Sequence, residues 1–182
     1  MAEFDDTIAY LAALEADPDL AVLSMQMTAD ALGVGRGAIV NRINAGSLEA
    51  IKIGRVRYVL AGSVINILSE RKAEVATVKL FLEEIASLGC STAYAPVMVK
   101  IDRSTTIPND RAIIGRILGE ISRESYDEHG FLLSALVNNS ALGKPSESFF
   151  LLAGDLDPSY DSSDSDEDYL ADQLRLIHAH YG

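Results

Sequence analysis

The sequence contains no tryptophan, a single cysteine, five prolines and no long hydrophobic run. The lone thiol, Cys90, excludes an internal disulfide and cannot by itself build a thiolate metal site. No apolar segment approaches the roughly 20 residues that a membrane helix needs, and the N-terminus is acidic where a signal peptide is basic. We therefore expect a cytoplasmic protein without a membrane segment.

Positive charge is also scarce, because 15 Lys and Arg face 27 Asp and Glu, for a net charge of −12. This excess of acid argues against nucleic-acid binding by the chain as a whole, since phosphate neutralisation needs clustered bases. The bases are unevenly distributed, however. Residues 33–60 hold five of them against one acid, whereas residues 155–168 hold seven acids and no base. The first stretch is a local candidate for contact with phosphate groups.

No set of residues typical of catalysis or metal binding stands out. His178 and His180 are two residues apart and point to different faces of a helix, and His129 precedes a glycine that ends one. Ser134 lacks the glycines of a nucleophile elbow. The glycines of 33–37 follow a helical pattern, where a phosphate-binding loop would follow a strand. We expect no enzyme, no cofactor and no metal.

A weaker alternative uses four charged residues of the C-terminal half. Asp110, Glu120 and Glu124, together with Lys144, are of the types that hold a divalent ion for nucleic-acid cleavage. Asp110 is also expected to cap a helix, and Glu120 and Glu124 share an exposed helix edge. The sequence favours these structural roles.

Residues 23–60 predict two short helices followed by a hairpin. The first helix covers 28–32 and ends at Gly33, and the second covers 35–44. Two short helices joined by a tight glycine-containing turn form a helix-turn-helix. The residues expected to pack are Ala29, Ala31 and Leu32 in the first helix and Ile39, Val40 and Ile43 in the second.

Beyond Gly46 the hydrophobic period changes from helical to alternating. Ile51 and Ile53, then Val56, Tyr58 and Leu60, predict two strands around a Gly54-Arg55 turn. This hairpin is expected to form a wing beside the helix pair.

Residues 23–71 resemble the excisionase or MerR-type DNA-binding domain, which is a winged helix-turn-helix. The resemblance is carried by the helix pair, the Asn-Ala-Gly-Ser-Leu passage at 44–48 and the Lys-Ile-Gly-Arg-Val-Arg hairpin at 52–57. It implies binding to double-stranded DNA, with the second helix in the major groove and the wing on the backbone or minor groove. The candidate DNA-binding residues are Arg36, Asn41 and Arg42 on the second helix and Lys52, Arg55 and Arg57 on the wing. Asn41 is the best candidate for adenine readout, because its amide can bond bidentately to that base.

Further helices are predicted on both sides of this stretch. Phe4, Ile8, Leu11 and Leu14 indicate a helix that ends near Asp17, which packs on the winged domain or pairs with another copy. Residues 63–71 predict a closing helix, with Ser63 as a candidate cap and Val64, Ile65 and Leu68 on one face.

An apolar stripe then continues along a connector helix of about five turns to Gly89. The stripe consists of Val75, Val78, Leu82, Ile85 and Leu88. It forms an antiparallel dimer seam or packs within the monomer. We expect a homodimer, because a single small module with five bases binds DNA weakly alone.

The C-terminal half predicts a small α+β domain. Residues 95–101 favour an extended segment, Asp110 begins a helix that ends at Gly130, and 131–137 and 148–153 favour buried strands. Residues 108–153 resemble an uncharacterised module of bacterial and phage-related proteins, which implies a recurrent domain and no particular chemistry.

The last residues combine acid and a short helix. Asp161–Asp168 is low-complexity sequence that predicts a flexible linker, and a helix with Tyr169, Leu174 and Ile177 on one face follows it. This acidic region is a solubilising tail with a docking helix, or it mimics DNA and occupies the basic groove.

These observations predict an α+β protein in four parts. A winged helix-turn-helix covers 1–71, a connector helix 72–89, a small α+β domain 90–154, and an acidic linker with a short helix 155–182. The expected function is sequence-specific DNA binding as a dimeric transcriptional regulator or excisionase-like accessory factor, with the C-terminal domain available to a protein partner. The alternative is a phage- or defence-associated winged-helix adaptor whose acidic C-terminal region is a DNA mimic or docking site.

Overall fold

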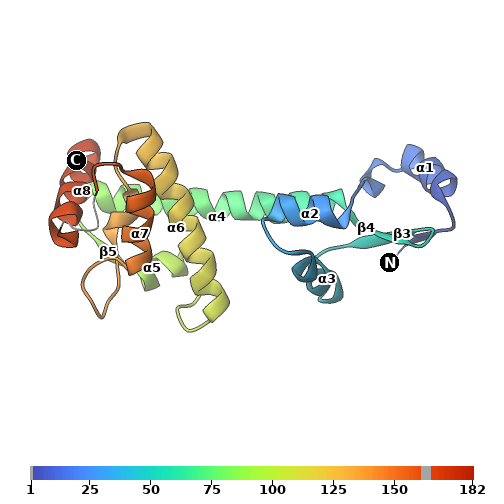
Figure 1. Cartoon of the computed structure of the whole chain (residues 1–182), viewed down its shortest axis with the longest axis horizontal. Helices are drawn as coiled ribbons and strands as arrows, with labels where there is room; N and C mark the ends of the chain where they lie inside the picture. The colour runs from blue at the N-terminus through green and yellow to red at the C-terminus, as the bar shows by residue number, and fades with distance from the viewer. Residues whose placement is uncertain (1, 161–164) are drawn as a thin grey trace. The chain divides into compact units, whose positions relative to one another are not determined.

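The computed structural model describes residues 2–160 and 165–182. The protein is about 65% helical, and its described residues form a four-stranded and a two-stranded sheet (Figure 1). Two compact units divide the chain, Met1–Lys72 and Ala73–Gly182. The mixed α+β class predicted from the sequence is confirmed.

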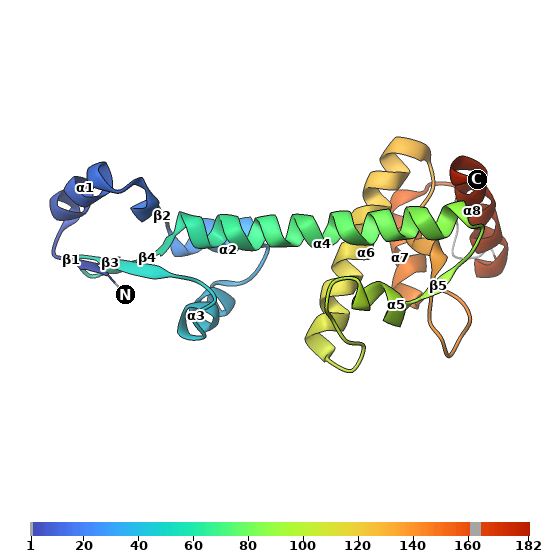
Figure 2. The ribbon, with the colours of Figure 1, turned by 180° about the vertical axis from the view of Figure 1, so that it is seen from behind.

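The N-terminal unit combines short strands with short helices (Figure 2). The sheet has the strand order β1-β3-β4-β2, in which β1 runs parallel to β3 and the other neighbours are antiparallel. In chain order its elements are β1 (Glu3–Phe4), α1 (Thr7–Ala16), a 3-10 turn (Pro18–Leu20), β2 (Val22–Leu23), α2 (Met25–Leu32), α3 (Arg36–Asn44), β3 (Ala50–Ile53) and β4 (Val56–Leu60).

The two helices and the hairpin form where the sequence predicts them. α2 begins three residues earlier than expected, because the Ser24 hydroxyl accepts a hydrogen bond from the Met27 amide at 3.1 Å and caps the helix. It ends at Gly33, whose φ of 64° is the left-handed conformation that favours glycine. Helix α1 is likewise capped, because the Asp6 carboxylate accepts a hydrogen bond from the Ala9 amide at 2.8 Å.

The core of this unit is built from α2, α3, β4 and the start of the helix that follows. Two expected core residues, Ala31 and Val40, are instead exposed. Each residue turns a helix by about 100°, so Val40 lies that far around α3 from Ile39, whereas Ile43 lies only about 40° away. The buried residues are Ala29, Leu32, Ile39, Leu48, Val59 and Val64.

One continuous helix, α4 (Ala61–Ser87), replaces the separate closing and connector helices that the sequence predicts. Of the expected closing face only Val64 is buried, while Ile65 and Leu68 are exposed. Further along, Val78 and Leu82 are fully buried within the C-terminal unit. The central part of the stripe that we expected as a dimer seam or an internal packing face is therefore covered by the chain itself.

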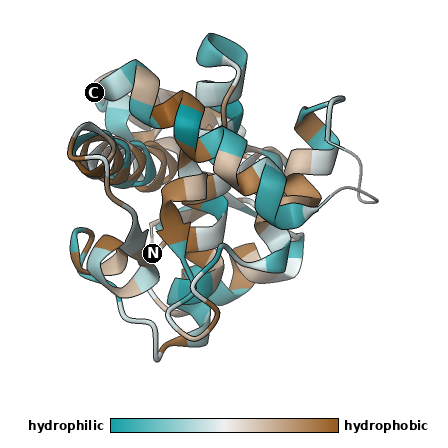
Figure 3. Cartoon of the chain, turned by 90° about the vertical axis from the view of Figure 1, so that its left-hand side faces the viewer, coloured by the Kyte–Doolittle hydropathy of each residue, from teal (hydrophilic) through white to brown (hydrophobic). Residues whose placement is uncertain are grey.

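The C-terminal unit packs helices around the end of α4, and hydrophobic and hydrophilic residues alternate along them (Figure 3). β5 and β6 pair in parallel, with Thr92 opposite Val137. After α4 the elements are β5 (Thr92–Ala93), α5 (Tyr94–Val99), α6 (Pro108–His129), a 3-10 turn (Leu133–Leu136), β6 (Val137–Asn138), α7 (Glu147–Leu156) and α8 (Asp166–Tyr181).

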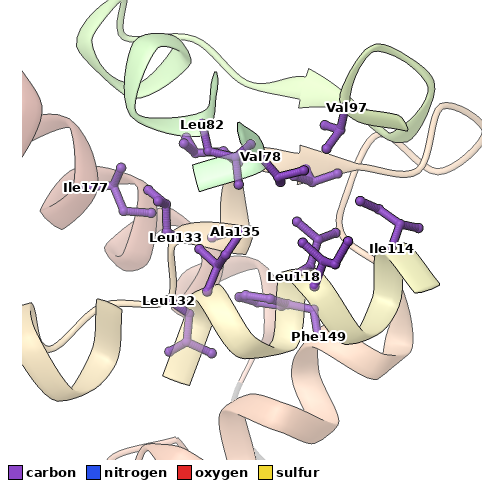
Figure 4. Packing of buried hydrophobic residues seen from close by; sticks show 14 of the residues in the cluster. Val78, Leu82, Val97, Ile114, Leu118, Leu132, Leu133, Ala135, Phe149 and Ile177 are labelled. Carbon is purple, nitrogen blue, oxygen red and sulfur yellow. The ribbon is translucent and has the colours of Figure 1, made fainter. Parts of the chain in front are cut away.

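Side chains from every helix of this unit converge on one core (Figure 4). Leu82 comes from α4, Val97 from α5, Leu118 from α6, Phe149 from α7 and Ile177 from α8. The core therefore joins segments almost 100 residues apart in the sequence.

The extended and strand predictions for this half of the chain are wrong. Residues 95–101 lie largely in α5, and residues 148–153 lie in α7. In α7, Phe149, Phe150 and Ala153 are buried while Leu151 is exposed, which is a helical pattern. A short apolar run has the same composition in a buried strand and in a buried helix. The two can be told apart only when it is known which residues of the run are buried.

Residues 131–137 form a 3-10 turn and end in the two-residue strand β6, although a longer buried strand was expected. Their backbone groups are bonded by buried side chains. Ser125 Oγ accepts a hydrogen bond from the Leu133 amide at 3.0 Å and donates one to the Phe131 carbonyl at 2.9 Å, and Gln173 Oε1 accepts one from the Leu132 amide at 2.8 Å. These bonds satisfy the buried polar groups without a strand ladder.

Two further local predictions are corrected. α6 begins at Pro108, so Asp110 is not its cap but lies in the first turn, where it accepts hydrogen bonds from the Ser104 amide and Arg103. Asp166, Glu167 and Asp168, expected in a linker, form the first turn of α8, where negative charge is favourable and Ser165 caps the helix. The remainder of the predicted linker, 161–164, lies outside the described residues.

α8 is part of the C-terminal unit, with Ile177 fully buried and Gln173 nearly so. Across residues 2–160 and 165–182, no helix is both long enough and apolar enough to span a membrane.

Candidate nucleic-acid interface

The exposed side of α3 carries polar side chains around a single apolar one. Arg36, Asn41 and Asn44 are exposed, and Val40 lies among them with 39% of its surface accessible. At about 100° per residue these four positions span roughly 140° of the helix surface. Ile39 on the other side anchors the helix in the core, so the orientation of this face is fixed by packing.

Arg42 lies apart from this face. It follows Asn41 by one residue, is half-buried, and is about 170° from the centre of the exposed face. Its carbonyl accepts hydrogen bonds from the amides of Ser47 and Leu48 at 3.0 and 3.3 Å. The backbone of Arg42 thus holds the passage from α3 to β3.

Sequence reasoning missed Asn44. The signal for it was present, because Asn44 follows Asn41 by three residues and therefore shares its face. A second carboxamide on the exposed face doubles the groups on α3 that can pair with adenine.

The first turn of α3 is exposed and lacks a side-chain cap. Gly35 is the N-cap and forms no side-chain hydrogen bond, and Arg36 and Gly37 follow it on the surface. The first amides of a helix have no partner within the helix and attract negatively charged oxygens.

The hairpin of β3 and β4 carries the other three candidate residues. Lys52 lies directly opposite Arg57, so the two cations share one face of the hairpin, and Arg55 lies in the turn. Opposed like charges repel when nothing neutralises them. The hairpin therefore favours an anionic partner on this face.

Lys52 already has a partner at the edge of the sheet. Its Nζ lies 3.6 Å from Glu3 Oε2 of β1, although both side chains remain largely in solvent. An ion pair of this kind is weak and screened by salt. Lys52 is thus a less available cation than its two neighbours.

Arg55 and Arg57 are both exposed. Among the residues that the structure describes, no carboxylate lies within 4 Å of either guanidinium, and the same holds for Arg36. Within the described residues, no ion pair competes with a partner outside the chain for these three guanidinium groups.

The hairpin is braced at its turn. Gly54 has a φ of 58°, and its amide donates a hydrogen bond to the Phe4 carbonyl of β1 at 2.9 Å. β1 therefore ties the turn to the sheet, which reduces the motion of the arginines beside it.

The charge of the two units differs widely. The N-terminal unit has seven bases and nine acids, and the C-terminal unit has eight bases and 18 acids. Most of the excess acid therefore belongs to the C-terminal unit, whereas the N-terminal unit is close to neutral and carries an exposed group of arginines.

The carboxylates considered for a divalent ion do not meet as a set. Asp110 is bound by Arg103, and Glu124 lies 3.0 Å from Lys79. In the described part of the chain, no three side chains of His, Cys, Asp or Glu are grouped so as to hold a metal.

No protein-family model matches the chain, and no curated protein and no solved structure matches it.

Proposed function

We propose that the N-terminal unit is a winged helix-turn-helix of the excisionase or MerR type that binds double-stranded DNA. The protein then acts as a transcriptional regulator or as an excisionase-like accessory factor in recombination. The observation that carries this proposal is the pair Arg55 and Arg57, which are exposed on a braced hairpin with no carboxylate within 4 Å among the described residues. Unpaired arginines on a projecting hairpin fit a phosphate backbone or a narrow minor groove.

The exposed face of α3 supplies the second contact in this proposal. Asn41 and Asn44 read base edges in the major groove, Val40 contacts a thymine methyl group, and Arg36 contacts a phosphate beside the first turn. Arg42 and Lys52 have lesser roles, because Arg42 is half-buried and Lys52 is paired with Glu3.

A homodimer is part of the proposal. Among the described residues of one unit, Arg36, Arg55 and Arg57 are exposed with no carboxylate within 4 Å, and the affinity that so few phosphate contacts supply is small at physiological salt. Two copies bound at adjacent half-sites would double the number of contacts.

The test is binding of the full-length protein to a DNA fragment from its own upstream region, measured by fluorescence anisotropy at several salt concentrations. In the double variant Arg55→Ala/Arg57→Ala, we expect weaker binding to every sequence. The slope of log K against log salt should fall by about 2 per protomer, since each lost phosphate contact removes about 0.9. Asn41→Ala should instead reduce the preference for the specific fragment over random DNA.

A matched control removes the same charge elsewhere. Arg116→Ala/Arg175→Ala deletes two exposed arginines of the C-terminal unit and should leave the salt slope unchanged. Equal slopes for the hairpin variant and the unmodified protein would remove the hairpin from the interface. Absence of binding at low salt would reject the DNA-binding proposal.

The second candidate function is a protein-binding adaptor. It is favoured by the C-terminal unit, whose 18 acids against eight bases suit a basic protein partner or a DNA mimic. In that case the protein binds no DNA fragment, and a pull-down with the full chain recovers a basic partner whose release requires salt.

A further inference from the structure

A cavity of about 520 Å³ lies within the C-terminal unit, away from the proposed DNA interface. Its walls come from α5, Thr105 and the N-terminal third of α6, the loop at 139–141 and the start of α7. This volume is within the range of pockets that bind small molecules.

The wall of this cavity contains an arginine and no acid. Arg111 is exposed on α6, and within the described residues no carboxylate lies within 4 Å of its guanidinium. Of the residues that the structure describes, no Asp or Glu lines the cavity, although the C-terminal unit holds 18 of them against eight bases. The cavity therefore favours an anion in a unit whose surface repels one.

Hydroxyl groups line the same cavity as this arginine. Tyr94 Oη lies 3.0 Å from Ser146 Oγ, which lies 2.8 Å from Ser148 Oγ, and Thr105 and Ser140 also line the cavity. Hydroxyl groups rotate to donate to whichever acceptor is present. The set can follow an incoming oxyanion without moving the backbone.

Apart from Asn139, whose Oδ1 accepts a hydrogen bond from the Ala141 amide at 3.0 Å, the remaining described lining residues are apolar or glycine. Met98 and Ile114 are each 1% exposed and belong to the core of the unit (Ile114 is labelled in Figure 4). A ligand that fills the cavity thus has an apolar part as well as a charged end.

A second observation concerns Gly115, which lies within α6. A glycine there destabilises a helix relative to alanine, so a packing reason is expected. A Cβ atom at Gly115 would meet nothing within 4 Å, and the residue lines the cavity. Gly119, one turn later, differs because a Cβ there would lie 3.4 Å from Arg123 and 4.0 Å from Leu152. Gly115 is exposed and lines the cavity, so an alanine Cβ there would extend into open space beside the cavity.

We propose that this cavity binds a small phosphate monoester with an apolar body. The guanidinium of Arg111 and the serine and tyrosine hydroxyls receive the phosphate, whose three terminal oxygens match several donors better than the two oxygens of a carboxylate. The apolar body lies over Met98 and Ile114 beside Gly115. This proposal is independent of DNA binding.

The test is a titration of the ¹⁵N-labelled full chain with inorganic phosphate, followed by NMR. Saturable shifts are expected for the amides of Arg111, Gly115, Ser146 and Ser148 at millimolar phosphate. Arg111→Gln should abolish these shifts, whereas Arg116→Gln, which changes an exposed arginine of α6 outside the cavity, should retain them. Absence of saturable shifts, or their persistence in Arg111→Gln, would overturn the proposal.

A second arm tests the apolar body. Phenyl phosphate should bind about tenfold more tightly than inorganic phosphate, because its ring is removed from water against Met98 and Ile114. Gly115→Ala should raise the melting temperature and lose this gain, whereas Gly119→Ala should retain it. Equal binding of the two phosphates would refute the apolar subsite, and tighter binding of benzoate than of phenyl phosphate would refute the preference for phosphate.

Discussion

Replacement of Ser125 by alanine tests whether side chains hold the buried turn after α6. Ser125 is 1% exposed, and its hydroxyl serves two backbone groups at once, the Leu133 amide and the Phe131 carbonyl. The variant leaves both groups buried without this partner. Each unsatisfied buried group costs about 1–3 kcal/mol, and alanine returns about 0.5 kcal/mol of helix propensity. We expect a loss of about 2–5 kcal/mol in the free energy of unfolding.

The measurement is urea denaturation followed by far-UV circular dichroism, because the chain has no tryptophan to report by fluorescence. Ser87→Ala is the matched control. Its hydroxyl donates to the Glu84 carbonyl three residues earlier, as Ser125 does to Ser122, but Ser87 is exposed to solvent. The control should change stability by less than about 0.5 kcal/mol. An equally small change for Ser125→Ala would refute the claim that this hydroxyl replaces a strand ladder.

Two further substitutions probe other parts of the fold. Burial raises the pKa of the Asp157 carboxyl, but hydrogen bonds from Ser159 and Tyr169 outweigh burial. The net effect lowers this pKa below its ordinary value of 3.8. The ionised form therefore stabilises the fold above this value, and the stabilisation disappears as the pH falls through the lower pKa of the folded state. Asp157→Asn should cost about 1.5–3 kcal/mol at pH 7 and flatten the loss of stability in acid, whereas Asp155→Asn, at an exposed position, should do neither. In the hairpin, Gly54→Ala should cost about 1–2 kcal/mol, because φ is 58° there and an alanine Cβ is strained in that conformation; unchanged denaturation of the N-terminal unit would argue against this strain.

The candidate interface was largely accessible to sequence reasoning. Arg55 and Arg57 could be placed on a hairpin because Gly54 specifies a tight turn between two alternating runs. The sequence could not show that Lys52 faces Glu3, since Glu3 is 49 residues away along the chain and β1 reaches β3 only in the folded sheet. Nor did it distinguish Arg42 from Asn41, because this requires knowledge of which side of α3 meets the core.

The sequence by itself determined the local elements of the N-terminal unit and the uneven distribution of charge. Helix caps, glycine turns and hydrophobic periods act over a few residues, so Gly33 and Gly54 could be assigned from the sequence, whereas the Ser24 cap, which is equally local, was missed. In the C-terminal unit the helix that ends at Gly130 and the last helix were also predicted, but only the tertiary structure decided the conformation of the apolar runs between them. Residues 131–137 have the composition of a buried strand, but Gln173, more than 35 residues away, and Ser125 on α6 provide the hydrogen bonds that permit a turn. An apolar run records that a segment is buried, whereas its backbone conformation depends on which polar partners the rest of the chain brings to it.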